Sequence, residues 1–296
     1  MNAASFRLYG LLGLMTLIWS INYVAAKIGL RSFPALLFAP MRALIASAIL
    51  VPLYFWAEHR YPHHATPWKR EEVPVMVALG IFGIALNQLF FILGMARTTV
   101  AHASLIIATT PVQVLLLAWL RRQEMLSGRK LMGMMTAFAG IASLNIAPSR
   151  VASTATPMGD LLVFLASLTF ALYTVVSREI AQQHGSITVN FFGFLAASLV
   201  MVPVGIWNGW HFDWTLPTYG GWLALVFMAA CGSVLSYLIY NYALAKIPAS
   251  RVASFSYSQP LIATAIGFAA LGEPVTWRVV LGGTLVLSGV WLVGRS

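Results

Sequence analysis

The chain has 296 residues, of which 59% are hydrophobic and 9% are charged, and these proportions exclude an ordinary soluble globular protein. Its formal net charge is +10, but most Lys and Arg residues lie between apolar runs, so we expect no nucleic acid as a partner. The apolar runs recur at about the 20 residues that a helix needs to cross a bilayer, so we expect membrane lipids to surround the chain.

Ten transmembrane helices are predicted when each apolar run is closed at charge clusters or at Pro and Gly turns. In chain order, the first half is expected to form helices over residues 8–30, 34–57, 73–95, 98–120 and 131–147. A connecting loop is expected over 148–157, followed by helices over 158–180, 187–207, 219–244, 249–271 and 275–293. The sequence therefore predicts an all-α integral membrane protein, with one five-helix unit in residues 1–147 and another in 158–296.

Positive charge is distributed unevenly between the two sides of the membrane that these helices define. Loops on the side of the N-terminus hold twelve Lys and Arg residues and the opposite loops hold five, with Arg42 inside the second helix left out of the count. Translocated loops are poor in Lys and Arg. We therefore expect both termini in the cytoplasm, in a multi-pass protein of the inner or plasma membrane.

The two halves of the chain match each other without gaps at residue types that are uncommon in membrane helices. A shift of 151 residues places Asn22 on Tyr173 and Pro52 on Pro203, and a shift of 149 serves the later helices. The later matches are Gly83 with Gly232, Ala96 with Ala245, Pro111 with Pro260, Glu124 with Glu273, Arg129 with Arg278, Gly133 with Gly282 and Gly140 with Gly289. Shared hydrophobicity does not explain matches of Pro, Glu and Arg, so they indicate an internal duplication.

Five helices per repeat is an odd number, so the second copy is expected to enter the membrane from the opposite face. The halves are then inverted repeats around a central cavity, related by an axis in the membrane plane. Two such halves can exchange conformations and open the cavity to each side in turn. The repeat therefore favours a secondary transporter over a channel or an enzyme.

Polar and aromatic side chains near the middle of the helices are the candidate substrate-binding residues. Such polar groups cost free energy in lipid unless they face a cavity or a partner, and Tyr combines an apolar face with a polar tip that suits an amphipathic solute. The candidates are Trp19, Asn22, Tyr23, Asn87, Gln88, Thr110, Gln113, Tyr173, Tyr237, Tyr240, Tyr257 and Gln259. The alternative is that these side chains only form hydrogen bonds between helices.

Pro111 and Pro260 occupy equivalent mid-helix positions in the predicted spans. Each removes a backbone donor and frees a carbonyl one turn earlier. They are candidate hinges beside Gln113 and Gln259. The alternative is a static kink in each helix.

Few charged or titratable residues are expected inside the helices, and no Asp or Glu lies near the centre of any span. His102, near the end of the fourth helix, can titrate in the physiological range, so it is either the candidate for coupling to protons or a structural residue. Arg42, about a third of the way into the second helix, either binds a solute carboxylate or pairs with backbone carbonyls or a carboxylate of the protein. Glu124 and Glu273 precede the fifth and tenth helices, where a carboxylate can cap a helix start or pair with an Arg.

No motif for catalysis or metal binding is present in the sequence. There is no G-x-x-x-x-G-K-[ST] phosphate loop and no H-E-x-x-H pair, and Cys231 is the one cysteine. We therefore expect no enzyme activity, no metal and no cofactor. The expected partners are a small-molecule substrate, lipids and, as a coupling ion, protons.

Several segments resemble the EamA type of the drug/metabolite transporter superfamily, in order and in duplicate over essentially the whole chain. They are Leu17 to Lys27 (LIWSINYVAAK), Pro34 to Pro52 (PALLFAPMRALIASAILVP), and the paired stretches that end in Glu124 and in Leu271-Gly272-Glu273-Pro274. Arg42 matches an arginine common in the second helix of that family. The resemblance implies a central cavity to which helices 1, 3, 4, 6, 8 and 9 contribute, and many members export amino acids or other small metabolites.

We therefore expect a secondary transporter that exports amino acids or similar amphipathic metabolites by alternating access. The alternative is a lipid flippase or scramblase, which would need a polar groove open to lipid instead of a closed cavity. A cavity lined by the candidate side chains would favour the transporter, whereas candidate side chains that face the bilayer would exclude it.

Overall fold

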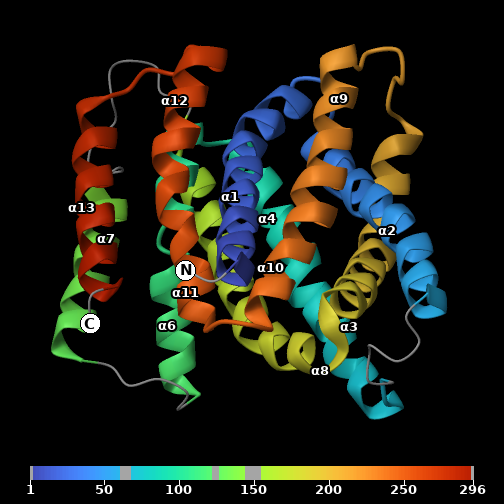
Figure 1. Cartoon of the computed structure of the whole chain (residues 1–296). Helices are drawn as coiled ribbons and strands as arrows, with labels where there is room; N and C mark the ends of the chain where they lie inside the picture. Colours follow the sequence, from blue (N-terminus) through green and yellow to red (C-terminus); the bar gives the residue numbers. More distant parts are fainter. Residues whose placement is uncertain (1–2, 61–67, 122–126, 144–154, 295–296) are drawn as a thin grey trace.

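The computed structural model describes residues 3–60, 68–121, 127–143 and 155–294, and the regular structure in these ranges is helical, with no strand among them. The predicted all-α architecture is therefore confirmed for the described part of the chain. Figure 1 shows the helices as a bundle with α1 near its middle. Glu124 and residues 148–154 of the predicted connecting loop lie outside the described residues.

The first half of the chain consists of helices whose bounds follow the predicted spans closely. They are α1 Ala3–Leu30, α2 Ala35–Arg60, η1 Arg70–Glu72, α3 Val73–Ala78, η2 Leu79–Ala85, α4 Leu86–Met95, α5 Val100–Ile107, α6 Thr110–Leu120 and α7 Gly128–Ser143. The segments from η1 to α4 run on as one helical stretch, Arg70–Met95. The helix predicted over 131–147 is α7, and its last predicted residues, 144–147, lie outside the described ranges.

The second half contains the remaining helices of the described ranges. They are α8 Pro157–Trp210, α9 Tyr219–Phe227, η3 Met228–Leu235, α10 Ser236–Leu244, α11 Ala249–Ala253, η4 Ser254–Ser258, α12 Gln259–Leu271 and α13 Trp277–Gly294. Between α11 and α12 the chain forms the short 3₁₀ helix η4 instead of an α-helix. The span predicted over 249–271 is therefore helical but interrupted.

The long element α8 consists of two helical segments joined at Gly185, whose φ is 81°. Glycine adopts such a positive φ without steric cost because it has no Cβ. A straight helix of its 54 residues would be about 80 Å long, far more than a bilayer core of about 30 Å. The side-chain nitrogen of Asn241 donates to Tyr173 Oη at 2.7 Å and to Asn190 Oδ1 at 3.2 Å. These acceptors lie on opposite sides of Gly185 in the sequence, so the chain folds back there, between the helices predicted over 158–180 and 187–207.

Threonine side chains cap the N-termini of several helices. The hydroxyls of Thr99, Thr156 and Thr218 accept hydrogen bonds from backbone N–H groups three residues later, at 3.2, 3.1 and 3.1 Å. Such caps satisfy donors that a helix start leaves without an intrahelical partner. At the other end of α12, Gly272 takes a left-handed conformation with φ of 67°, which ends the helix.

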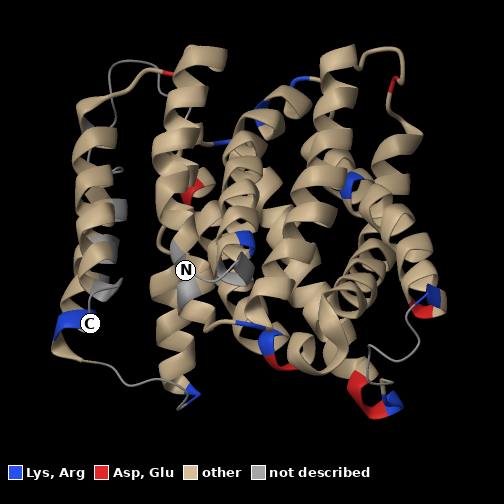
Figure 2. Cartoon of the chain, in the orientation of Figure 1, with Lys and Arg blue, Asp and Glu red and all other residues tan. Residues whose placement is uncertain are grey.

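Large apolar side chains point outward from the bundle, while many polar ones lie inside it. Leu199 and Phe268 are more than half exposed, whereas Asn190 and Asn241 are fully buried. Figure 2 shows most Lys, Arg, Asp and Glu residues towards the two ends of the bundle. In the described ranges, six helical stretches are long and apolar enough to cross a membrane: Phe6–Leu30, Ala35–Arg60, Arg70–Met95, Val100–Leu120, Pro157–Trp210 and Tyr219–Leu244. The chain is a multi-pass membrane protein.

Departures from α-helical geometry recur at one spacing along the chain. The π-helical segments η2 and η3 begin at Leu79 and Met228, which are 149 residues apart. The segments α6 and α12 begin at Thr110 and Gln259, again 149 residues apart, and each follows a break in its helix. The same shift that aligns the two halves of the sequence therefore also aligns their irregular turns.

One close contact between helices is also found twice. In one copy the glycine belongs to the first half and its partner to the second, and in the other copy the reverse holds. A Cβ atom added to Gly83 would overlap the ring of Tyr173, and one added to Gly232 would overlap Asn22 Oδ1. Gly83 matches Gly232 at a shift of 149, and Asn22 matches Tyr173 at a shift of 151. Small residues at these places allow the helices to approach closely.

Two helices stand at one side of the bundle, away from its middle. α7 and α13 pack along each other there (Figure 1). Gly140 lies so close to Val286 and the carbonyl of Gly282 that an added Cβ would overlap both. Near the middle, α1 packs against α9, α10 and α12, which brings the first half into contact with the second.

Candidate functional site

A cavity of about 70 Å³ lies inside the bundle beside α1. Its walls come from α1, α2, α4, α5 and α6 of the first half and from α8, α10, η4 and α12 of the second. The lining residues that the sequence singled out are Trp19, Asn22, Tyr23, Arg42, Asn87, Thr110, Tyr237 and Gln259. The cavity thus brings together residues from both halves, far apart in the sequence.

Other lining residues were not named as substrate-binding candidates from the sequence. They are Phe91, Ile107, Phe170 and Ser256. Phe and Ile are generic in membrane helices and carry no polar signal. Ser256 did carry such a signal, since it is a hydroxyl three residues before Gln259.

Arg42 is held by α2 on the wall of the cavity and is only 4% exposed. Its Nε donates a hydrogen bond to Ser233 Oγ on η3 at 2.8 Å. Among the described residues no carboxylate forms an ion pair with Arg42, and no backbone carbonyl accepts from it. Of the alternatives left by the sequence, pairing with protein carboxylates or carbonyls is therefore not found there. The contact that is present joins α2 to the second half of the chain.

Amide groups border the cavity with part of their hydrogen-bonding capacity unused. Tyr23 Oη donates to Gln259 Oε1 at 2.9 Å, which joins α1 to α12. Gln259 Nε2 and Asn22 Oδ1 have no hydrogen-bond partner among the described residues, although Asn22 is 5% and Gln259 1% exposed. Leaving such a buried group unpaired costs about 1–3 kcal/mol. One donor and one acceptor beside the cavity are thus unpaired among the described residues.

Aromatic rings form the wall around Trp19. Its ring lies 5.5 Å from Phe170, 6.0 Å from Tyr237 and 5.5 Å from Tyr240 between centroids. The indole Nε1 donates to the carbonyl of Gly232 at 3.1 Å, so the ring is held in one orientation. An aromatic wall of this kind suits the apolar part of a small solute.

Asn87 and Thr110 also belong to the polar lining, and their side chains already form hydrogen bonds within the protein. Asn87 donates to the carbonyl of Ala166 at 2.8 Å and accepts from Tyr237 Oη at 3.3 Å. The Thr110 hydroxyl lies 2.9 Å from Ser167 Oγ. Both side chains face the cavity while they also connect helices, so the two alternatives drawn from the sequence are not exclusive for them.

The remaining candidates lie outside the lining of this cavity: Gln88, Gln113, Tyr173, Tyr240 and Tyr257. Tyr173 Oη accepts from Asn241 at 2.7 Å, and Tyr240 Oη lies 2.7 Å from Thr174 Oγ1. These contacts match the alternative in which the side chains join helices. Gln88 is 1% exposed, and its amide has no hydrogen-bond partner among the described residues.

Pro111 and Pro260 each stand at the second residue of a helical segment, α6 and α12, and not in the middle of one as the sequence suggested. The helix breaks before Pro111, and the 3₁₀ turn η4 precedes α12. Because Pro has no N–H, the carbonyl of Ile107 is left to accept from Thr110 Oγ1 at 2.6 Å. The prolines therefore mark interruptions of two helices, both beside the cavity.

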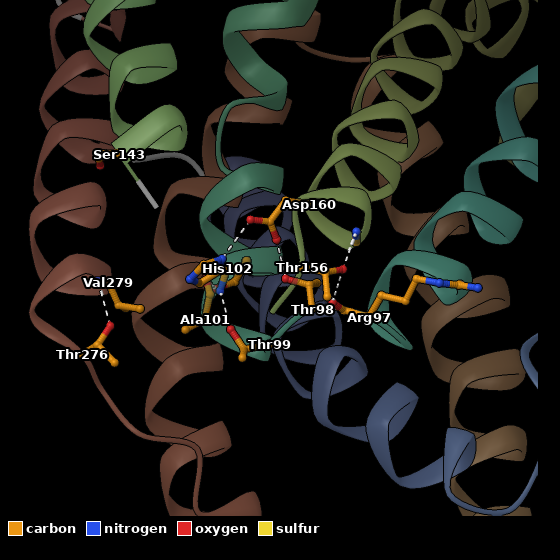
Figure 3. Close-up of polar contacts among 12 residues, drawn as sticks. Arg97, Thr98, Thr99, Ala101, His102, Ser143, Thr156, Asp160, Thr276 and Val279 are labelled. Atoms are coloured by element: carbon orange, nitrogen blue, oxygen red, sulfur yellow. Dashed lines mark hydrogen bonds and ion pairs between the residues drawn. The ribbon is translucent and has the colours of Figure 1, made fainter. Parts of the chain in front are cut away.

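His102 is not isolated, because it lies against Asp160 at the start of α8 (Figure 3). His102 Nδ1 and Asp160 Oδ2 are 2.9 Å apart, and the Thr98 hydroxyl donates to Asp160 Oδ1. Both residues are more than 90% buried. The sequence named His102 but not Asp160, which stands 58 residues further on, near a helix end.

Glu273 caps a helix start, but not that of α13, the helix that follows it. Its carboxylate oxygens accept from the backbone N–H of Val100, the first residue of α5, at 3.1 and 2.9 Å. A negative charge at this position interacts favourably with the helix dipole of α5. A second cavity, of about 410 Å³, opens beside Glu273, Lys27 and Arg31.

Comparisons with known proteins bear on the whole chain. A family model described as the EamA-like transporter family matches it twice, over residues 8–146 and 157–295. A protein of Archaeoglobus fulgidus named an uncharacterized transporter is 27% identical over 283 residues, which are 95% of each chain. The uncharacterized inner membrane transporter YedA of Escherichia coli (strain K12) is 26% identical over 279 residues, covering 91% of this chain and 84% of YedA.

A solved crystal structure has a similar fold. It superposes with a TM-score of 0.67 over 96% of both chains, at 19% sequence identity. At this identity the likeness concerns the fold alone.

Proposed function

Because the chain belongs to the EamA-like transporter family, we propose that it is a secondary active transporter that exports small amphipathic metabolites, such as amino acids, by alternating access. That it is a membrane transporter follows from the family. The proposal adds the mechanism, the direction and the class of solute. The observation that carries it is the central cavity, whose walls come from both halves of the chain.

The proposed architecture is ten transmembrane helices in two inverted repeats of five. It is supported by the two family matches, by the π-helical segments 149 residues apart, and by the exchanged contacts of Gly83 and Gly232. The fold-back at Gly185 adds a helix to the second half, as the proposal requires. With the excess of Lys and Arg on the side of the N-terminus, both termini are cytoplasmic.

The size of the cavity supports a mechanism in which its walls move. About 70 Å³ is far below the roughly 300–1,000 Å³ of pockets that hold small ligands. The helices must therefore separate to admit a solute, and the breaks before Pro111 and Pro260 are the proposed hinges. The proposed contacts with the solute are Trp19, Asn22, Tyr23, Asn87, Thr110, Tyr237 and Gln259.

The pair of His102 and Asp160 is the proposed site of the coupling proton. It is buried and joins α5 to α8, two elements that also line the cavity. Glu273 accepts a hydrogen bond from Val100 at the start of α5, and Arg97 lies in the turn before α5. Transfer of a proton to or from the pair would change its charge and so alter the contact between α5 and α8.

The test is efflux from liposomes that contain the purified protein and a mixture of amino acids and other metabolites, with and without an imposed pH gradient. Saturable efflux above that of protein-free liposomes supports the transporter, and acceleration by the gradient that is lost in His102→Gln supports the proton site. If no solute moves but labelled lipid crosses between leaflets, the lipid flippase replaces this proposal. If neither moves, both are contradicted.

A further inference from the structure

We propose that Arg42 binds a carboxylate of the transported solute, so that the substrate is a small organic monoanion or zwitterion with one carboxylate beside an apolar group. This inference rests on the proposed function, since it assigns the substrate class of the same cavity. It goes beyond that function by naming the chemical group that the cavity recognises.

Arg42 lies inside the bundle with few partners among the described residues. Arg42 as a whole residue is 4% exposed, and its one described hydrogen bond uses Nε, towards Ser233 Oγ. The two Nη groups thus have no partner among the described residues, although they carry most of the donors of the side chain. A buried cation is strongly unfavourable unless an anion or several acceptors compensate it. The compensation that the described residues lack is what a bound carboxylate supplies.

Among the described residues that line the cavity, Arg42 is the one charged side chain. One guanidinium compensates one negative charge and matches the planar carboxylate with two parallel hydrogen bonds. A phosphate ester carries about −1.5 to −2 at neutral pH and would leave charge uncompensated. The charge balance therefore favours a carboxylate over a phosphate.

Asn22 lies beside Arg42. A Cβ atom added to Gly232 would stand 3.6 Å from Arg42 Nη2 and would overlap Asn22 Oδ1, so both atoms lie next to the same glycine. Asn22 Oδ1 has no hydrogen-bond partner among the described residues, and it can accept from an ammonium or hydroxyl on the solute. The rings of Trp19 and Tyr237 supply an apolar wall on the same cavity.

The experiment is carried out on liposomes with the wild-type protein, loaded with amino acids, carboxylic acids and their primary amides, neutral sugars and nucleosides. Efflux of each compound is followed by mass spectrometry against protein-free liposomes. We expect that every compound carried by the protein has a carboxylate, and that the amide of the best one leaves at least about 30-fold more slowly. A carried compound without a carboxylate, or an amide carried equally fast, overturns the inference and leaves the proposed function intact.

Variants then test the assignment to Arg42. Arg42→Met is expected to lose efflux of the best compound by a similar factor, and Arg42→Lys to retain part of it, because the charge remains without the planar fork. Ser233→Ala is the matched control, since it removes the protein contact of Arg42 and keeps the cation, so efflux is reduced but not abolished. Normal elution and unfolding temperature in detergent show that each variant is folded.

Unchanged efflux in folded Arg42→Met would assign carboxylate selectivity to other residues and overturn the inference. If the wild-type protein carries no compound at all, the proposed function itself fails, and the inference with it. If Arg42→Met does not fold, the comparison of acids with amides on the wild-type protein still decides the question.

Discussion

The central cavity and the start of α5 both hold charged side chains inside the bundle, but they differ in how those charges are paired. At the start of α5, Asp160 meets His102 and Thr98, and Glu273 meets the backbone of Val100. In the cavity, Arg42 has one serine as its described partner, and amide atoms of two neighbouring side chains have none.

The difference separates groups that hold the fold together from groups that are available to a ligand. Paired groups stabilise the contact between elements. Their hydrogen-bonding capacity is already used within the protein, so they can bind a proton but not a solute. Unpaired groups lower the stability of the empty protein and gain their partner from a solute. The contrast predicts losses of stability of different size for variants in the two regions, decreasing from Asp160 to Glu273 to Arg42.

The largest change is expected for Asp160→Ala. The variant leaves His102 and Thr98 without their partner in a buried place, so we expect the free energy of unfolding to fall by about 3 kcal/mol. The measurement is denaturant or thermal unfolding of the protein in detergent. Asp213→Ala is the control, because Asp213 is an exposed carboxylate that bonds to Thr215 in the loop after α8. Equal losses in the two variants would contradict the role given to the buried pair.

A smaller change is expected for Glu273→Gln. The variant keeps an oxygen that accepts from Val100 but loses the negative charge that interacts favourably with the helix dipole of α5. We therefore expect the free energy of unfolding to fall by about 1 kcal/mol. The same unfolding measurement applies. Glu71→Gln is the matched control, since Glu71 is exposed in η1. No difference from that control would show that the contact between Glu273 and α5 adds nothing to stability.

The smallest change is expected for Arg42→Met. The variant loses a hydrogen bond to Ser233 but also removes a buried cation that lacks an anion, so the two effects nearly cancel and the change stays within about 1 kcal/mol. Unfolding in the absence of any solute is the measurement. A fall as large as that of Asp160→Ala would place Arg42 with the structural pairs and end the contrast between the regions.

Much of the fold follows from the sequence because length and turn chemistry are local. The apolar runs predicted the spans, and the break between the helices predicted over 158–180 and 187–207 lies at Gly185, the residue with positive φ. Depth in the membrane also follows from position in a span. That is why residues such as Asn22, Tyr237 and Gln259, from three separate helices, line one cavity.

Partners across the bundle do not follow from the sequence. His102 meets Asp160 at a separation of 58 residues, and Arg42 meets Ser233 at 191. Such pairs depend on the rotation of each helix about its axis, which a nearly uniform apolar pattern leaves undetermined. Asn87 and Gln88 illustrate this, because only Asn87 lines the cavity although both lie at one depth. One position along a helix turns a side chain by about 100°.

The π-helical segments η2 and η3 have a consequence for the order of residues along these two helices. A π turn holds an additional residue, so everything beyond it is displaced by one position relative to an uninterrupted α-helix. Asn87 and Tyr237 both stand just beyond such a turn. Removing one residue from η2 or η3 would therefore exchange the side chains presented to the interior for their neighbours without substituting any of them. In these two helices the number of residues, as much as their identity, specifies which side chains face the cavity.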